Sequence, residues 1–282
     1  MKLETLQPTF SYKIRGAVNA VRRLAGEGGA RPLVTASAGN HGRALAAAAR
    51  DAGLPLTVFV PESAPRTKLD AIRALGARLE PCADYDEAER RAKAHAGTGA
   101  ALYISPYSHP DVIAGAGTVG LEVIDAWPEV DLVVVPIGGG GLISGIAVAA
   151  QGLGAAVEVA GVEVQASCPF TRSRAAGHIV AIDVQPTLAD GLAGNLDPDA
   201  ITFDLVQRLV PRIAVVGEDD LRRAIAGLAD QEKLIVEGAG ATAAAAVLSG
   251  AIDVRDRRTA VIVSGANIDV DSLASILAGV TD

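Results

Sequence analysis

Short apolar runs alternate with amphipathic segments along most of this chain. The runs that predict strands are Leu33–Ala36, Leu56–Val60, Leu132–Ile137, Val157–Val164 and Thr259–Val263. Between them, residues 66–75 carry apolar side chains at helical spacing, residues 84–95 predict a polar helix, and an alanine-rich helix is expected from about residue 43. Strands that alternate with helices predict parallel sheets, so the fold class is α/β.

Composition narrows the possible partners and compartments. The 282 residues carry a formal net charge of −8, and the arginine pairs are scattered among acidic residues, which disfavours nucleic-acid binding. We find no signal peptide and no membrane-spanning run. Cys82 and Cys168 match no metal-binding spacing, and we expect both to be reduced thiols in a cytoplasmic protein.

Four segments carry candidate chemistry. They are Ser11-Tyr12-Lys13-Ile14-Arg15-Gly16-Ala17, Ser37-Ala38-Gly39-Asn40-His41-Gly42, Gly138-Gly139-Gly140-Gly141 and Ser264-Gly265-Ala266-Asn267. The last three each follow a predicted strand, where ligands of open α/β sheets bind. A desolvated lysine at a helix start, such as Lys13, can act as a nucleophile and form a Schiff base, although an isolated lysine is more often simply exposed.

The glycine run at Gly138–Gly141 favours an anion site. Backbone N–H groups at a helix N-terminus bind phosphate, and glycines let the backbone approach it closely. The run does not match the G-x-G-x-x-G pattern of dinucleotide-binding folds, so NAD is disfavoured. A flexible loop is the alternative interpretation, and we consider it weaker because the run joins a strand directly to a helix.

Together, these four segments and their order resemble the serine/threonine dehydratase family. This family belongs to the pyridoxal-phosphate (PLP) enzymes of the tryptophan-synthase-β type, fold type II, and the resemblance runs from about Lys2 to Asp269. It implies two open parallel-sheet domains with the PLP site between them. The implied large domain is 1–32 plus 114–282, and the implied small, inserted domain is 33–113.

The resemblance also implies a role for each site residue. Lys13 would be the catalytic residue that carries the cofactor as a Schiff base, and Tyr12 would lie beside its ring. Asn40 would bind the phenolic oxygen, Gly138, Gly139, Gly140 and Gly141 the phosphate, and Ser264 the pyridine nitrogen. The substrate carboxylate would be bound by the loop of Ser37, Ala38, Gly39, Asn40 and His41, whose N–H groups form an anion-binding nest.

The reaction implied is PLP-dependent elimination of water from L-threonine or L-serine, which gives a 2-oxo acid and ammonia. A racemase, or a dehydratase of another β-hydroxy amino acid such as phenylserine or 3-hydroxyaspartate, stays open. So does a non-catalytic PLP- or phosphate-binding protein. Racemases of this family usually carry a second serine where this chain has Ala38, which favours a dehydratase.

Three further expectations follow from the resemblance. Some relatives bind a divalent cation through a glutamate and an aspartate six residues later. Here Glu163 is followed by Pro169, so we expect no metal site. The N-terminus is short relative to the family, and no regulatory domain is expected after Asp269. Family members commonly form homodimers or homotetramers, and we expect the same here.

Overall fold

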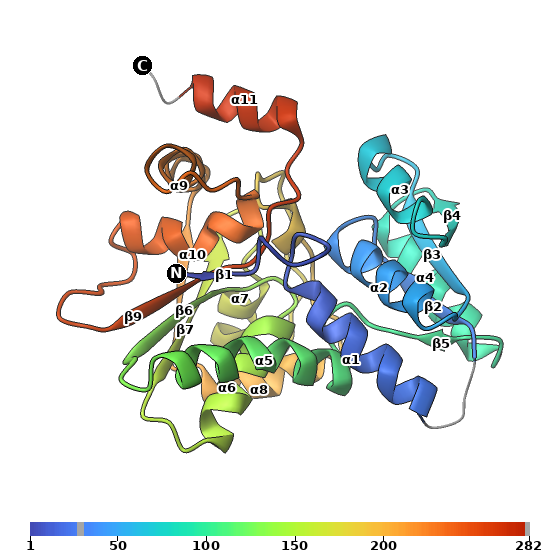
Figure 1. The fold of residues 1–282 in the computed structure, drawn as a ribbon, viewed down its shortest axis with the longest axis horizontal. Coiled ribbons are helices and arrows are strands. Elements are labelled where there is room, and N and C mark those ends of the chain that lie inside the picture. Colours follow the sequence, from blue (N-terminus) through green and yellow to red (C-terminus); the bar gives the residue numbers. More distant parts are fainter. Residues whose placement is uncertain (27–30, 280–282) are drawn as a thin grey trace. The chain divides into compact units, whose positions relative to one another are not determined.

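The computed structural model describes residues 1–26 and 31–279 (Figure 1). The chain divides into two compact units, a larger one of Met1–Tyr12 with Ala116–Asp282 and a smaller one of Lys13–Gly115. Each unit is an α/β fold built on its own parallel sheet, which confirms the predicted fold class. Among the described residues, no helix combines the length and apolar character needed to cross a bilayer.

The larger unit contains a five-stranded parallel sheet with strand order β1-β9-β6-β7-β8. In chain order these strands are β1 (Lys2–Leu3), β6 (Leu132–Pro136), β7 (Glu158–Val164), β8 (Arg212–Val216) and β9 (Thr259–Val263). The helices are the later part of α5 (Pro110–Ala126), α6 (Gly141–Gly152), α7 (Pro169–Ala176), α8 (Ile201–Leu209), α9 (Glu218–Gln231), α10 (Gly238–Leu248) and α11 (Val270–Ala278). A short 3-10 helix, η1, covers Asp190–Leu192.

The central strands of this sheet are covered on both faces. In Figure 1, α6 and α8 lie on one side of the sheet and α9 and α10 on the other. Helix α6 packs on β6 and β7, and α10 packs on β6, β7, β8 and β9. All five residues of β6 are buried, as expected for a strand that reads as one apolar run. The alanines of α10 allow that helix to approach the sheet closely.

The smaller unit contains a four-stranded parallel sheet with strand order β4-β3-β2-β5. Its elements are α1 (Lys13–Gly26), β2 (Leu33–Ala36), α2 (Asn40–Asp51), β3 (Leu56–Pro61), α3 (Arg66–Arg73), β4 (Arg78–Cys82), α4 (Tyr85–Gly97), β5 (Leu102–Tyr103) and the start of α5. Side chains alternate across the sheet. Leu33 packs into the core beneath α1 and α2, and Val34 packs into the core beneath α4.

Two boundaries differ from the sequence-based expectation. Helix α2 begins at Asn40, three residues before the expected start, because Gly39 has non-helical dihedrals (φ −110°, ψ −146°) and caps the helix. Residues 13–26 group with the smaller unit, whereas the predicted boundary left them in the large domain. The physical reason is that Ile14, Ala17 and the rest of the buried face of α1 share one apolar core with α2.

Candidate active site

The predicted site residues follow the carboxyl ends of strands in each unit. In the larger unit, Gly138–Gly141 come just after β6, and Ser264 comes directly after β9. In the smaller unit, Ser37 comes directly after β2, and Lys13 is the first residue of α1. Ligands of open parallel sheets bind at the carboxyl ends of the strands, so each unit presents candidate ligand groups at the expected edge.

Lys13 is held at the start of its helix by packing and by a hydrogen bond. Its Nζ donates to the carbonyl oxygen of Pro106 at 2.7 Å. Helix α1 approaches α5 closely, because a Cβ on Gly115 would lie 2.4 Å from the Arg15 carbonyl oxygen. A side chain larger than hydrogen at residue 115 would therefore push the first turn of α1 away. Lys13 is half-buried, and its amino group has a defined acceptor.

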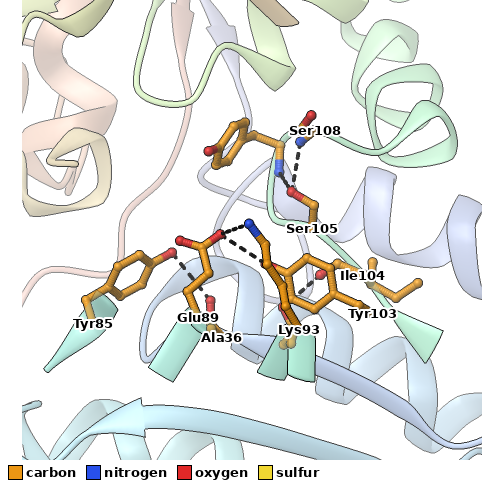
Figure 2. A network of polar contacts seen from close by, with 10 residues as sticks. Ala36, Tyr85, Glu89, Lys93, Tyr103, Ile104, Ser105 and Ser108 are labelled. Atoms are coloured by element: carbon orange, nitrogen blue, oxygen red, sulfur yellow. Dashed lines mark hydrogen bonds and ion pairs between the residues drawn. The ribbon is translucent and has the colours of Figure 1, made fainter. Parts of the chain in front are cut away.

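The carbonyl group of Pro106 is a partner of Lys13 that the sequence did not indicate. Figure 2 shows the segment that leads to it, in which Ser105 Oγ accepts a hydrogen bond from the Ser108 N–H at 3.0 Å. The same figure shows the Tyr103 hydroxyl donating to Glu89 Oε1 at 3.3 Å, which ties β5 to α4. A backbone carbonyl has no side-chain signature, so only the folded arrangement identifies Pro106 as the partner of Lys13.

The loop before α2 folds back closely on the first turn of that helix. A Cβ on Gly42 would lie 2.1 Å from the Ser37 carbonyl oxygen, so residue 42 must be glycine for the loop to fold back on the helix. The Ser37 hydroxyl accepts a hydrogen bond from the Gly39 N–H at 3.3 Å. The N–H groups at the start of a helix have no partner within the helix, so this loop can bind an anion through its backbone.

His41 is a buried neutral imidazole, which limits its role in that loop. Its Nε2 lies 3.2 Å from the Ile104 carbonyl oxygen, an acceptor, so Nε2 carries the proton. Burial, together with the positive charge of Lys13 as a smaller cause, lowers the pKa of His41 to about 3. The ring Nδ1 then has no proton and finds no hydrogen-bond donor among the described residues. The ring cannot donate to a substrate carboxylate, so only the backbone N–H of His41 is suited to that task.

This assignment predicts a pH effect on stability. The pKa of His41 is lower in the folded state than in the unfolded state, so folding is favoured above pH 6.5 and loses this contribution as the pH falls. Between pH 7 and pH 5, the His41→Gln apoprotein should lose about 2 kcal/mol less unfolding free energy than the wild-type apoprotein. Urea denaturation at the two pH values measures the difference.

The matched control for this experiment is His178→Gln, since His178 is exposed. That variant should follow the wild-type pH dependence. If His41→Gln also followed it, His41 would not be the neutral, buried ring described above.

The glycine loop of the larger unit, Gly138–Gly141, is a tight cradle. Gly140 has left-handed dihedrals (φ +84°, ψ −2°) and caps α6. A Cβ on Gly138 would lie 3.0 Å from Leu192 Cα, and one on Gly140 would lie 2.5 Å from Phe170 Cζ. Gly138 and Gly139 are half-buried, whereas Gly140 and Gly141 are buried. The loop therefore presents backbone groups, without side chains, at a helix N-terminus.

Ser264 lies in a crossing of the N-terminal segment with the end of β9. Its backbone carbonyl accepts from the Tyr12 N–H at 3.0 Å, and Ser11 forms a bridge with Gly265. Its buried Oγ lies 3.5 Å from the Ala239 carbonyl oxygen, a long hydrogen bond. A neutral hydroxyl that is only weakly held can accept from or donate to a ligand.

The buried carboxylate of Glu163 accepts hydrogen bonds from the start of α7. One carboxylate oxygen accepts from the Phe170 N–H at 2.8 Å. The other accepts from the Thr171 N–H at 2.8 Å and from the Thr171 hydroxyl at 2.6 Å. Burial raises the pKa of Glu163, and these hydrogen bonds oppose that effect. Within the described ranges, no cluster of three or more histidine, cysteine, aspartate or glutamate side chains could hold a metal ion.

Comparison with known families agrees with this geometry. A family model described as "Pyridoxal-phosphate dependent enzyme" matches residues 1–265. The chain belongs to this family of PLP-dependent enzymes. The resemblance inferred from the four sequence motifs is thereby confirmed, and PLP is the cofactor of the family.

Individual relatives of this PLP-dependent enzyme cover nearly its whole length. The L-threonine ammonia-lyase of Thermotoga maritima is 41% identical over 278 residues, which are 98% of this chain and 69% of the relative. The catabolic L-threonine dehydratase TdcB of Escherichia coli is 36% identical over 98% of this chain and 84% of its own length.

Two solved structures show the same fold. Processed threonine deaminase isoform 2 from Solanum lycopersicum superposes with a TM-score of 0.89 at 33% identity, over 98% of this chain and 82% of that one. The serine racemase of Dictyostelium discoideum gives a TM-score of 0.87 at 34% identity, over 95% and 87%. A threonine deaminase and a serine racemase are therefore both among the similar structures.

The residues of this PLP-dependent enzyme fit the cofactor. The aldehyde of PLP forms a Schiff base with an amine, and its phosphate binds to hydrogen-bond donors. Lys13 supplies an amine with a fixed acceptor beside it. The Gly138–Gly141 cradle supplies a helix N-terminus where a Cβ at residue 140 has no space.

Proposed function

We propose that this chain removes water from L-threonine, and from L-serine, to give a 2-oxo acid and ammonia, with Lys13 carrying PLP. The observation that carries the proposal is the position of Lys13. It begins α1 with its amino group on the Pro106 carbonyl oxygen, in the same unit as the anion-binding loop Ser37–His41. In the net reaction, threonine becomes 2-oxobutanoate and ammonia, because the water lost on elimination is regained on hydrolysis.

When bound, PLP supplies an electron-accepting ring that stabilises the charge left at the α-carbon of the amino acid. Lys13 would hold the cofactor through its amine, and the free Lys13 Nζ would accept the α-proton of the amino acid. The Pro106 carbonyl accepts a hydrogen bond from Lys13 Nζ and so limits the directions that the amine can take. An oriented base contributes about 10²–10⁴-fold to the rate of proton transfer.

The remaining residues of the proposed site would bind and orient the substrate and the cofactor. Backbone N–H groups of Ser37, Ala38, Gly39, Asn40 and His41 bind the substrate carboxylate, and the Asn40 side chain binds the phenolic oxygen of the cofactor. Gly138–Gly141 would hold the phosphate at the start of α6, Tyr12 would lie beside the ring, and the Ser264 hydroxyl would meet the ring nitrogen. With a neutral hydroxyl at this position, the ring nitrogen would stay unprotonated, and the bound cofactor would favour elimination over racemisation.

Ala38 supports a lyase over a racemase. Racemisation needs a second group that delivers a proton to the opposite face of the α-carbon, and the methyl group of Ala38 has no proton to give. The similarity to the Dictyostelium discoideum serine racemase keeps racemisation as the second candidate.

Two product measurements on the PLP-loaded protein test the reaction. With L-threonine, 2-oxobutanoate should form in amounts that greatly exceed the enzyme concentration. With L-serine, pyruvate should form and D-serine should stay below about one hundredth of it, because Ala38 has no proton to deliver to the opposite face of the α-carbon.

Other outcomes identify the other candidates. Sustained D-serine formation would make racemisation the reaction, and turnover of phenylserine or 3-hydroxyaspartate alone would change the substrate. PLP binding without any turnover would favour a non-catalytic PLP-binding protein. We propose a cytoplasmic homodimer or homotetramer as the working form, in line with the resemblance to dehydratases.

A further inference from the structure

One peptide of the glycine loop Gly138–Gly141 is fixed by a side chain from α8. Thr202 is fully buried, and its Oγ1 donates to the Gly139 carbonyl oxygen at 2.8 Å. The carbonyl of residue 139 and the N–H of residue 140 belong to one planar trans peptide, so they point in opposite directions. Holding the Gly139 carbonyl toward Thr202 therefore turns the Gly140 N–H away from α8.

The next residue is held from one side by an aromatic ring. Phe170 is fully buried, and its Cζ lies 2.5 Å from where a Cβ on Gly140 would be. The ring stacks on Phe203 with centroids 6.5 Å apart and an interplanar angle of 29°. Phe203 follows Thr202 in α8. One helix therefore supplies both the Thr202 hydroxyl, which binds the loop, and the Phe203 ring, which packs against Phe170.

Glu163 in turn fixes the start of the helix that carries Phe170. Its carboxylate accepts the N–H groups of Phe170 and Thr171, in the first turn of α7, each at 2.8 Å. The residue before this helix is Cys168, which makes no side-chain cap. The buried carboxylate thus caps α7 from the neighbouring strand β7 and stabilises its first turn.

We propose that Thr202 and Phe170, with Glu163 behind Phe170, are positioning residues that hold Gly138–Gly141 in the orientation that receives the cofactor phosphate. Thr202 sets the direction of the Gly140 N–H, and Phe170 sets the position of the Gly140 backbone. The inference rests on the proposed function, because it concerns the phosphate of the same PLP site. It adds three residues, none of which would need to touch the cofactor.

The decisive experiment compares the binding of PLP with that of pyridoxal, which lacks the phosphate. Dissociation constants are measured for both ligands with wild-type protein, Thr202→Val and Thr202→Ser. Valine keeps the shape of threonine and removes its hydroxyl. Thr202→Val should bind PLP about fivefold to tenfold more weakly, the usual effect of losing one hydrogen bond, and should bind pyridoxal within about twofold of wild type. Thr202→Ser should restore the PLP affinity.

Thr242→Val is the matched control, since Thr242 is also fully buried and its hydroxyl donates to the Gly238 carbonyl oxygen at 2.9 Å. It should bind both ligands as the wild type does. Thermal unfolding of each apoprotein establishes that the variants are folded. The ³¹P NMR shift of bound PLP is a second readout, and it should change in Thr202→Val and not in Thr242→Val.

Each outcome decides the matter. Equal weakening of PLP and pyridoxal in Thr202→Val would mean general damage and would overturn the inference, as would wild-type affinity for both ligands. A wild-type protein that binds PLP but makes no 2-oxo acid would overturn the proposed reaction. The inference would still be supported if Thr202→Val changes the ratio of the PLP affinity to the pyridoxal affinity. A wild-type protein that binds no PLP would overturn both.

Discussion

Lys13→Ala should reduce the formation of 2-oxobutanoate from L-threonine by about a thousandfold or more, even with PLP in excess. The variant loses the amine that both attaches the cofactor and accepts the α-proton, and removing a general base alone costs about 10²–10⁴-fold. It keeps the glycine loop Gly138–Gly141, so PLP should still bind without a covalent bond. Product formation is measured alongside borohydride reduction and peptide mapping, which should place PLP on Lys13 in the wild type only.

Lys233→Ala is the matched control, since the chain has only five lysines and Lys233 is exposed, close to Asp230. It should keep wild-type activity and the same modified peptide. Full activity in Lys13→Ala, or cofactor mapped to another lysine, would show that the assignment of Lys13 is wrong.

The buried strands were the most predictable part of the fold. Two strands begin and end at the predicted residues, β2 (Leu33–Ala36) and β9 (Thr259–Val263). The predicted strand 132–137 is one residue longer than β6. A parallel strand that is covered on both faces is apolar along its whole length. It can therefore be recognised in the sequence without knowing which strands lie beside it. By contrast, β5 has two residues and β8 is a half-exposed edge strand, and neither pattern predicted a strand.

The residues of the candidate site could be proposed from the sequence where their side chains, or a run of glycines, form an unusual pattern. The amine of Lys13 and the run Gly138–Gly141 are visible in the sequence because each has an unusual residue type at a strand or helix boundary. The groups that hold Lys13 and the glycine loop in position cannot be recognised in the sequence. The Pro106 carbonyl, Thr202 and Phe170 come from segments with ordinary composition, and only tertiary packing brings them to Lys13 or to the loop within their own unit.

Glu163 stands at the first position of the cation motif considered in the sequence, but in the structure its carboxylate accepts hydrogen bonds from the protein. The sequence indicated that a cation site was incomplete because proline stands at residue 169. In the structure, that proline begins α7, and the Glu163 carboxylate accepts the N–H groups of the two residues that follow it. A buried carboxylate is costly unless it is paired or hydrogen-bonded, and here helix donors meet that need. The sequence alone could not identify these donors, because they are backbone groups.

Gly140→Ala should weaken PLP binding by about 30-fold or more. Alanine at φ +84° costs about 1–2 kcal/mol, and its Cβ would lie 2.5 Å from Phe170 Cζ, an overlap of the kind that costs about 1–3 kcal/mol more. The loop can relieve the backbone strain and the steric overlap only by moving. This movement displaces the N–H groups that are proposed to bind the phosphate. Every 1.4 kcal/mol is about tenfold in affinity, so the sum of about 2–5 kcal/mol sets the expected loss. Equilibrium titration with PLP measures it.

Gly154→Ala separates backbone strain from the steric overlap. Gly154 also has a positive φ, +62°, but a Cβ there would meet nothing within 4 Å. It lies beyond the opposite end of α6, so its alanine variant should lose about 1 kcal/mol of stability and keep wild-type PLP affinity. In Gly140→Ala, adding Phe170→Leu removes the ring that the new Cβ meets and should recover part of the lost affinity. Wild-type affinity in Gly140→Ala would show that the glycine loop does not bind the phosphate.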